Sequence, residues 1–490
     1  MDYFREAAEI YAGFLSHCHE DHLDGLTTFN LPVYCSDATK ELILRLKTRN
    51  ERANTQVTST PRFAHLRSNL VALPMNIPTK VSVGKVEVKV TLIEANHCPG
   101  SVMFLFETST ASVLVTGDIR AEPWVVNSFI NHPFLIPYAS CKPLDCIYMD
   151  TTFAYRNNGC PPYLEIGPNG PSVEELLQLL ERYPSDTRFV FNKVGTLGYE
   201  QIWIRIWARF HEKVHIDQYH LQLYQAIMDF DSTARQLVLN CVTSDPTAAR
   251  FHACSPSCRD YLESSSYVVY LSPVVDFHPL DVKILQSTYP SHQKGFKLVP
   301  GLSTSRLPVY TCQGLPAYRR YMLHNGEYFP LSLPFYYSRH SSYRETTHLI
   351  NSFQPRQVYP CTTRLEYYKN GFSMQDLFGP YCRTASNGFR HDQEMLSQVV
   401  QVPIPKESPV LAHRESSDSS NSSHGSILEM LCHNLKQAAA STTGGNHDRY
   451  NSPNAKHHPR RAPRLKRIVA SRTLSVDPRL RAKRTTTIVK

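Results

Sequence analysis

The 490-residue sequence lacks any apolar run close to the roughly 20 residues that a membrane-spanning helix needs. Its start, MDYFRE at residues 1–6, also lacks the basic stretch and apolar segment of a signal peptide. The 13 cysteines are odd in number and scattered, which is typical of a reduced chain rather than of a disulfide framework. We therefore expect an intracellular protein with no membrane segment, in which some thiols are available to bind metal.

Acidic residues are almost absent from the end of the chain. Residues 456–490 hold twelve Lys and Arg and one acid, Asp477, which gives this stretch a net charge of +11. The whole chain carries +9, so the remaining residues carry −2. The basic character belongs to a tail, which predicts an anionic partner or a nuclear import signal for that tail.

The length is sufficient for two or three domains, and a hydrophobic content of 41% is sufficient for substantial cores. Residues 1 to about 155 alternate between strand-like and turn-like segments, with one or two helices. From about 160 the pattern is β-α-β, and Ser172 and Glu175 form a capping box before a leucine-rich helix. From about 405 the sequence becomes Ser-rich and then basic, which predicts a disordered tail over 405–490.

The highest density of metal-binding side chains is in the segment 16–22, SHCHEDH, which follows a short apolar run. Imidazole and carboxylate groups are the usual protein ligands of divalent transition metals. Alternation along a strand end would point His17 and His19 the same way, while Asp21 and His22 fall in the following turn. A single histidine here would more often be a polar loop residue, but this spacing favours a metal site.

Other residues of the same kind follow later strands: His97, Asp118, Asp150 and, far along the chain, His340. Loops gather at strand ends in layered α/β proteins, so these side chains can meet the first segment. Each alone could be an ordinary loop or turn residue.

Together the ligand-type residues predict a centre for two metal ions. His17, His19 and His97 would hold one ion, Asp21, His22 and His340 the other, and Asp118 would bridge them. Two such ions can generate hydroxide near neutral pH and stabilise the attacking and leaving oxygens of a phosphodiester.

These motifs resemble the metallo-β-lactamase superfamily and, within it, the β-CASP nucleic-acid nucleases, above all the hairpin-opening DNA nucleases of end joining. The resemblance covers roughly residues 1–375 and is carried by the segments 14–22, 97–106, 116–118, 144–153, 198–200, 252–254 and 340–343. It implies an α/β fold: an αββα metallo-β-lactamase sandwich with an inserted β-CASP α/β domain. Residues 1–155 and 336–404 would form the sandwich, 156–335 the insert, and 405–490 the disordered tail.

The same resemblance implies roles for single residues. Asp150, His252 and His340 match the three β-CASP motif positions. Asp150 would orient the active-site network, while His340 would either bind metal or protonate the leaving oxygen. Ser341 and Ser342, if they open a helix, could bind a phosphate at its N-terminus. The catalytic set is then Asp21, Asp118, Asp150 and His340.

A second metal site is predicted in the insert. The segment from His252 through Cys254 to Cys258 places three zinc ligands within seven residues. The resemblance implies a structural zinc bound by His215, His252 and Cys254. The fourth cysteine of the family lies later than Cys258 and has no counterpart in this chain, so we expect Cys258 to replace it, with Cys241 as the alternative. His252 would then be structural rather than catalytic. The other interpretation is a group of unligated core thiols.

The sequence departs from the family pattern at two points. The resemblance implies at least one strand before Asp2, the first-motif aspartate, and none precedes it here, so the start is expected to be truncated or mis-set. Asn96 stands where glycine is common, which should be tolerable if the backbone there has an ordinary φ.

The resemblance implies a nuclear, zinc-dependent DNA nuclease that hydrolyses phosphodiesters at DNA ends or hairpins in double-strand break repair. It would work as a 5′-exonuclease, a hairpin or overhang endonuclease, or both. Its cofactors would be one or two catalytic Zn²⁺ ions and a structural one, with Mg²⁺ or Mn²⁺ an option in the second catalytic site. Its tail would contact end-joining kinase and ligase factors.

The alternatives are a 5′-exonuclease of interstrand cross-link repair, a β-CASP RNA-processing nuclease, a small-molecule hydrolase and a non-catalytic scaffold. The core begins at once and the extension follows it, an order that favours the end-joining group over the cross-link repair group.

Overall fold

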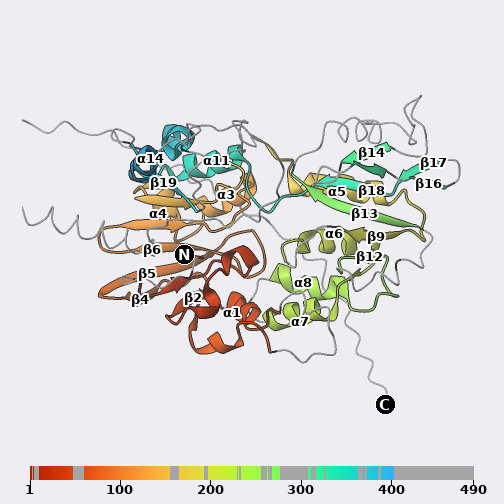
Figure 1. Ribbon diagram of the computed structural model, residues 1–490, viewed down its shortest axis with the longest axis horizontal. Coiled ribbons are helices and arrows are strands. Elements are labelled where there is room, and N and C mark those ends of the chain that lie inside the picture. The colour runs from red at the N-terminus through yellow and green to blue at the C-terminus, as the bar shows by residue number, and fades with distance from the viewer. Residues whose placement is uncertain are drawn as a thin grey trace, which may run out of the picture. The chain divides into compact units, whose positions relative to one another are not determined.

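A computed structural model describes the protein (Figure 1). The described residues are 1–2, 4, 10–47, 60–154, 165–192, 197–228, 230, 233–254, 262, 267–275, 307–310, 316–319, 321–324, 327–361, 368, 372–383 and 388–401. They all belong to one compact unit. The predicted tail over 405–490 and the candidate ligand Cys258 lie outside them.

The first two sheets form the centre of a four-layer sandwich. The larger has the strand order β19-β8-β7-β6-β5-β4 and is antiparallel from β4 to β7, then parallel through β8 to β19. Its strands are β4 (Thr79–Val83), β5 (Val86–Glu94), β6 (Val102–Glu107), β7 (Ser112–Val115), β8 (Cys146–Met149) and β19 (Gln357–Pro360). The smaller is parallel, in the order β1 (Gly13–Phe14), β2 (Val33–Ser36) and β3 (Leu70–Leu73).

Alternation along the strands separates two cores. On β6, Phe104 and Phe106 join the core shared with the smaller sheet, whereas Met103 and Leu105 join the core under the helices. The helices on that outer face are α3 (Pro123–Ile130), α4 (Ile136–Ser140), α11 (Tyr343–Phe353) and α13 (Met374–Phe378), followed by α14 (Arg390–Gln401). Helix α1 (Asp37–Ile43) packs beside β2 and β3 (Figure 1). This arrangement confirms the αββα sandwich.

A third sheet carries the predicted β-α-β pattern. It is parallel throughout, with the order β11-β10-β12-β9-β13-β18. Its strands are β9 (Arg188–Phe191), β10 (Val214–His215), β11 (Val242–Thr243), β12 (Phe251–His252), β13 (Val268–Val274) and β18 (Ser332–Tyr336). Its helices are α5 (Asn169–Leu180), α6 (Glu200–Phe210), α7 (Gln218–Ile227) and α8 (Thr233–Cys241). Two hairpins lie between β13 and β18: β14 (Leu307–Tyr310) with β15 (Pro316–Arg319), and β16 (Tyr321–His324) with β17 (Glu327–Pro330).

The insertion is visible in the strand order. After the third sheet the chain returns to add α11 and then β19, which pairs with β8 of the first sheet. The larger sheet of the sandwich is thus built from residues that precede the third sheet in the sequence and from residues that follow it. The predicted boundaries after residues 155 and 335 stay predictions. None of the helices in the described ranges is long and apolar enough to cross a membrane.

One local prediction was wrong, and the condition of an ordinary φ at Asn96 is not met. The box of Ser172 and Glu175 does not start α5, which begins at Asn169 because that side chain is bound on both sides. Its Nδ2 donates to the Ser338 carbonyl at 2.7 Å, and its Oδ1 accepts from the Ser338 amide at 2.9 Å. Asn96 has φ +50°, in the left-handed region, which asparagine tolerates better than most residues. Its Nδ2 also donates to the Arg120 carbonyl at 2.8 Å.

Candidate metal centre

The orientation of His17 is fixed by hydrogen bonds that begin at Asp2. The two carboxylate oxygens of Asp2 accept from the Ser16 amide at 2.7 Å and from its hydroxyl at 2.6 Å. Since the hydroxyl gives its only hydrogen to Asp2, its oxygen accepts from Nδ1 of His17, 2.9 Å away. The lone pair of His17 then resides on Nε2, which is buried and has no hydrogen-bond partner in the described part of the chain. A second group that fixes the tautomer of a histidine is typical of metal ligands.

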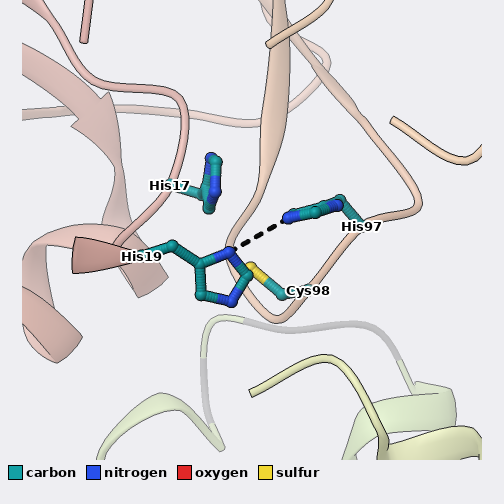
Figure 2. A group of neighbouring side chains, drawn as sticks. All are labelled: His17, His19, His97 and Cys98. Carbon is teal, nitrogen blue, oxygen red and sulfur yellow. Dashed lines mark hydrogen bonds between the residues drawn. The ribbon is translucent and has the colours of Figure 1, made fainter. Parts of the chain in front are cut away.

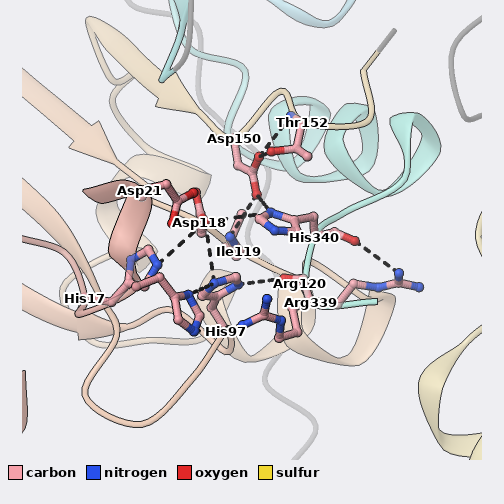
Figure 3. Close-up of polar contacts among 12 residues, drawn as sticks. His17, Asp21, His97, Asp118, Ile119, Arg120, Asp150, Thr152, Arg339 and His340 are labelled. Atoms are coloured by element: carbon pink, nitrogen blue, oxygen red, sulfur yellow. Dashed lines mark hydrogen bonds and ion pairs between the residues drawn. The ribbon is translucent and has the colours of Figure 1, made fainter. Parts of the chain in front are cut away.

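Asp118 lies among four of the predicted histidine ligands, of which Figure 3 labels His17, His97 and His340. The distances from its Oδ2 are 3.2 Å to Nε2 of His22, 3.5 Å to Nε2 of His97, 3.6 Å to Nε2 of His17 and 3.9 Å to Nδ1 of His340. Gly117, just before it, has φ +56°, and a Cβ there would lie 2.8 Å from Cβ of Ser16. The tight turn therefore brings Asp118 to both predicted ion positions, where a bridging carboxylate has to be.

Another group of side chains that could bind a metal ion consists of His17, His19, His97 and Cys98 (Figure 2). Nδ1 of His19 faces Nε2 of His97 at 3.0 Å, and one ligand atom from each of the four residues lies within 4.8 Å of the others. Cys98 is buried in the core, and its thiol donates to the Pro99 carbonyl at 3.7 Å. The three imidazoles match a zinc site, and either Cys98 or Asp118 could complete it.

The charge states of the histidines differ in a consistent way. Burial holds the pKa of His17, His19 and His97 well below the usual value. Neighbouring histidines lower all three pKa values further, and Arg339 lowers those of His19 and His97. These three rings are therefore neutral, which is the form that binds metal. Burial alone would lower the pKa of His22, but Asp118 and Asp2 raise it well above the usual value.

Asp150 and His340 form a pair beside this cluster (Figure 3). Oδ2 of Asp150 lies 2.9 Å from Nδ1 of His340 and accepts from the Ile119 amide at 3.1 Å. Its other oxygen accepts from the amide and hydroxyl of Thr152, at 3.0 and 2.7 Å. Burial opposes the charge on both partners, yet their attraction raises the pKa of His340 and lowers that of Asp150. Asp150 thus fixes the orientation of the His340 ring.

Ser341 and Ser342 have partners within the protein. The Ser341 hydroxyl accepts from the Ala121 amide and donates to the Ile119 carbonyl, both at 2.9 Å. Ser342 caps α11 in a capping box with Glu345. Both serines are buried, and these bonds hold the loop of His340. Their phosphate-binding role stays a prediction, since their hydroxyls would have to exchange these partners.

Asp21 is the predicted ligand that points least into the cluster. It lies in the short 3-10 helix η1 (Glu20–His22), its side chain is 78% exposed, and its Oδ2 is 3.7 Å from Nε2 of His22. Binding to the second ion would require this carboxylate to turn inward.

The structural-zinc residues also meet. Nδ1 of His215 lies 3.1 Å from Sγ of Cys254 and 3.4 Å from Nδ1 of His252. Burial lowers the pKa of both histidines, to about 4 for His252. Cys254 is disulfide-bonded in this structure. The alternative ligand Cys241 is not part of this group and donates to the Leu237 carbonyl at 3.0 Å.

Sequence reasoning gave no site role to Cys98, Arg120 or Arg339. Arg120 is buried, and its Nη1 donates to the His340 carbonyl at 3.1 Å. Nη1 of Arg339 lies 2.7 Å from Nε2 of His19. The only signal in the sequence was adjacency, because Cys98 and Arg339 are next to predicted ligands.

Several known proteins are similar to the chain. Protein artemis of Danio rerio is 28% identical over 399 residues, which are 77% of this chain and 53% of the relative. Protein artemis of Rattus norvegicus is 30% identical over 281 residues, 53% of this chain and 35% of the relative. The 5′ exonuclease Apollo of Gallus gallus is 32% identical over 210 residues, 42% of this chain and 38% of the relative. The chain thus spans between about a third and about half of these relatives.

Two other comparisons add nothing on function. No protein-family model matches the sequence. A crystal structure of a protein of unknown function from Enterococcus faecalis is 14% identical, with a TM-score of 0.45 over 79% of this chain and 81% of the other.

The layered α/β fold and the His/Asp cluster are consistent with a metallo-β-lactamase fold that carries a β-CASP insert. The chain is a distant homologue of the artemis and Apollo proteins, which are β-CASP nucleases.

The residues present fit a divalent transition metal. The buried Nε2 of His17 has no hydrogen-bond partner among described residues, and His17 and His97, whose pKa values burial lowers, both lie beside the Asp118 carboxylate. This donor set suits zinc, with manganese or magnesium better suited where carboxylates predominate.

Proposed function

We propose that this chain is a metal-dependent DNA nuclease that hydrolyses phosphodiesters at DNA ends or hairpins. The observation that carries the proposal is the position of Asp118, whose Oδ2 lies within 3.9 Å of four histidine nitrogens. DNA as the substrate, repair of double-strand breaks by end joining, and a nuclear location are supported by the homology to artemis and Apollo.

In this proposal His17, His19 and His97 hold a first zinc ion, and His22, Asp21 and His340 hold a second zinc, magnesium or manganese ion, with Asp118 between them. Bound metal would supply hydroxide at neutral pH and neutralise charge on the phosphate. Asp2 fixes His17 through Ser16 and also lies 3.2 Å from Nδ1 of His22.

Asp150 orients His340. The carboxylates of Asp150 and Asp118 raise the pKa of His340. The His340 ring is therefore suited either to bind metal or to give a proton to the leaving oxygen.

The experiment is a cleavage assay of the purified chain on hairpin, overhang and single-stranded DNA, with RNA of the same hairpin sequence in parallel. Wild type is expected to cut DNA, and Asp118→Asn to lose at least about 10²-fold in rate together with bound zinc. Glu87→Gln is the matched control, since Glu87 pairs with Lys80 on an exposed hairpin. Metal-loaded protein that cuts no DNA would refute the proposal. Cleavage of RNA alone would support the RNA-processing alternative.

Comparing the DNA substrates addresses the other alternative of the same family. Degradation of every free 5′ end with no cut in the hairpin loop would favour a cross-link-repair type of exonuclease. If the metal-bound wild type is active and Asp118→Asn has lost activity on all substrates, a non-catalytic scaffold is excluded. Contacts of the tail with end-joining kinase and ligase factors are part of the proposal and concern residues outside the described ranges.

We also propose that His215, His252 and Cys254 hold a structural zinc ion when Cys254 is reduced. The support is the placement of His215 and His252 on neighbouring strands β10 and β12, with Cys254 just after β12 and one ligand atom from each residue within 4.8 Å of the others. A fourth ligand from Cys258 remains a prediction. A tetrahedral N/S set of this kind is typical of structural zinc.

A further inference from the structure

Arg339 is a positive group at the metal centre, and no described residue is an acidic partner for it. It precedes His340, its side chain is half-buried, and no carboxylate of the described residues lies within 4 Å of its guanidinium. Since a guanidinium stays charged at any relevant pH, this charge is permanent. Its field also opposes protonation of His19 and His97, whose pKa values it lowers. A permanent charge in this setting is stabilised when an anion binds beside it.

The structure holds this arginine in place from several sides. Nη1 donates to the Leu197 carbonyl at 3.0 Å, and the guanidinium carbon lies 5.3 Å from the centre of the Tyr199 ring. Gly198, with φ +105°, leaves room for it, because a Cβ there would lie 2.5 Å from Cδ of Arg339. The segment around Gly198 is itself anchored: Glu200 accepts from the Gly198 amide at 2.9 Å. Arg339 therefore occupies a built position and not a free surface.

Proton counting shows which of its hydrogen bonds can persist. Nη1 of Arg339 lies 2.7 Å from Nε2 of His19, and because arginine only donates, that nitrogen accepts. His19 then carries its proton on Nδ1 and donates to Nε2 of His97, 3.0 Å away. His97 in turn donates from Nδ1 to the backbone carbonyl of Arg339, at 2.9 Å.

Metal binding is incompatible with this arrangement of protons. The two nitrogens that face each other, Nδ1 of His19 and Nε2 of His97, are the ligand atoms. If His19 binds metal through Nδ1, its only proton moves to Nε2, which can donate to the Leu197 carbonyl, 3.3 Å away. Nε2 then no longer accepts from Arg339, so the guanidinium has an N–H group to offer beside the ions.

We propose that Arg339 binds a backbone phosphate of the nucleic-acid substrate next to the metal centre. It would use the Nη1–H group that donates to Nε2 of His19 in the arrangement of protons described above. A phosphate that reaches the ions presents its non-bridging oxygens to this fixed guanidinium, and arginine–phosphate hydrogen bonds are among the strong charged pairs. The inference rests on the proposed function, because it takes a phosphodiester as the substrate.

The test is the salt dependence of binding to a 5′-phosphorylated oligonucleotide with phosphorothioate linkages, which keep the backbone charge and resist cleavage. Zinc-loaded wild type, Arg339→Gln, Arg339→Lys and Arg356→Gln are compared by fluorescence anisotropy, with zinc content measured for each. Arg356 is the matched control: its side chain is 60% exposed, and it lies near Asp145, at the end of β8 opposite Asp150.

The expected result is that Arg339→Gln keeps its zinc but reduces the slope of log K against log salt by about one phosphate contact. Arg339→Lys should recover most of the slope, and Arg356→Gln should keep all of it. An unchanged slope in zinc-loaded Arg339→Gln would overturn the inference. So would loss of zinc in Arg339→Gln, since the arginine would then act by positioning His19.

Cleavage is not needed for this measurement, so the two proposals can fail separately. A wild type that binds with an Arg339-dependent slope but cuts no DNA would refute only the proposed nuclease function. A wild type that cuts DNA while Arg339→Gln has the wild-type slope would refute only the phosphate contact.

Discussion

Nδ1 of His340 lies 2.9 Å from Oδ2 of Asp150, although Asp150 precedes the inserted sheet in the sequence and His340 follows it. Asp150 directly follows β8, whereas His340 follows β18 and precedes α11. The carboxylate of Asp150 accepts hydrogen bonds from the amides of Ile119 and Thr152 and from the Thr152 hydroxyl. Because these bonds fix the carboxylate, it holds the His340 ring in one orientation. The function of His340 should therefore depend on Asp150.

Asp150→Asn is expected to lower kcat by about 10–100-fold while the first zinc ion stays bound, since a group that orients an active-site histidine typically contributes that much. The substitution keeps the shape of the side chain and removes its charge. Steady-state kinetics on a hairpin substrate, with zinc content, would measure it. Asp145→Asn is the matched control at the other end of the same strand, where Asp145 accepts from the Ser112 amide. Equal activity in the two variants would show that Asp150 has no such role.

A second prediction concerns which side chain completes the site of His17, His19 and His97. A Cys98 thiolate would give a closed set of four ligands, whereas a hydrolytic zinc keeps a position for water. Cys98→Ser is therefore expected to keep its zinc and to retain activity within about threefold, allowing for the modest cost of burying a hydroxyl. Cys35→Ser, at another fully buried thiol, measures that cost separately.

Cobalt substitution gives an independent readout for Cys98. A thiolate–cobalt charge-transfer band that persists in Cys254→Ser but disappears in Cys98→Ser would show that Cys98 is a ligand after all. Under the prediction the band does not depend on Cys98.

Part of this centre was predictable because its spacing is local. His17, His19 and His22 lie within one segment, and the strand ends before His97 and Asp118 are visible as apolar runs followed by turns. The layered fold followed from the resemblance. Sequence spacing could not show how far Asp21 points outward, since exposure depends on the 3-10 turn that carries it.

Interactions between distant segments were also beyond the sequence. The start of α5 depends on Asn169 binding Ser338, which is far away in the chain and overrides the local capping signal. The contact of Arg339 with His19 likewise joins a residue that follows the insert in the sequence to one that precedes it. Propensity and spacing contain no information on such pairs until the fold is known.

A third prediction tests the second metal group. In reducing buffer, Cys254→Ser should hold one zinc fewer per chain than wild type and melt about 5 °C or more lower, since loss of a metal site removes a few kcal/mol from a domain of this size. Its activity on hairpin DNA should stay close to that of wild type at low temperature. Cys141→Ser, at an exposed free thiol, is the control. Equal zinc content in both variants, with Cys254 reduced, would exclude the structural zinc and leave the disulfide.

The last prediction concerns Arg120, which ties the His340 loop to the first helix of the returning segment. Its guanidinium is 1% exposed, with Nη2 3.0 Å from Oε1 of Glu345 and 3.8 Å from Oε1 of Glu122. Nη1 donates to the His340 carbonyl. Arg120→Met leaves two buried carboxylates without their counter-charge, so the free energy of unfolding is expected to fall by about 3–5 kcal/mol.

Denaturant unfolding of Arg120→Met and Arg344→Met separates burial from charge. Arg344 pairs with Glu165 at the surface, and its loss should cost no more than about 1 kcal/mol. In the double variant with Glu345→Gln, part of the Arg120 loss should be recovered, because glutamine can stay in the capping box without a charge to compensate. A purely additive double variant would mean that Arg120 stabilises the loop through its bonds to backbone carbonyls rather than through the ion pair.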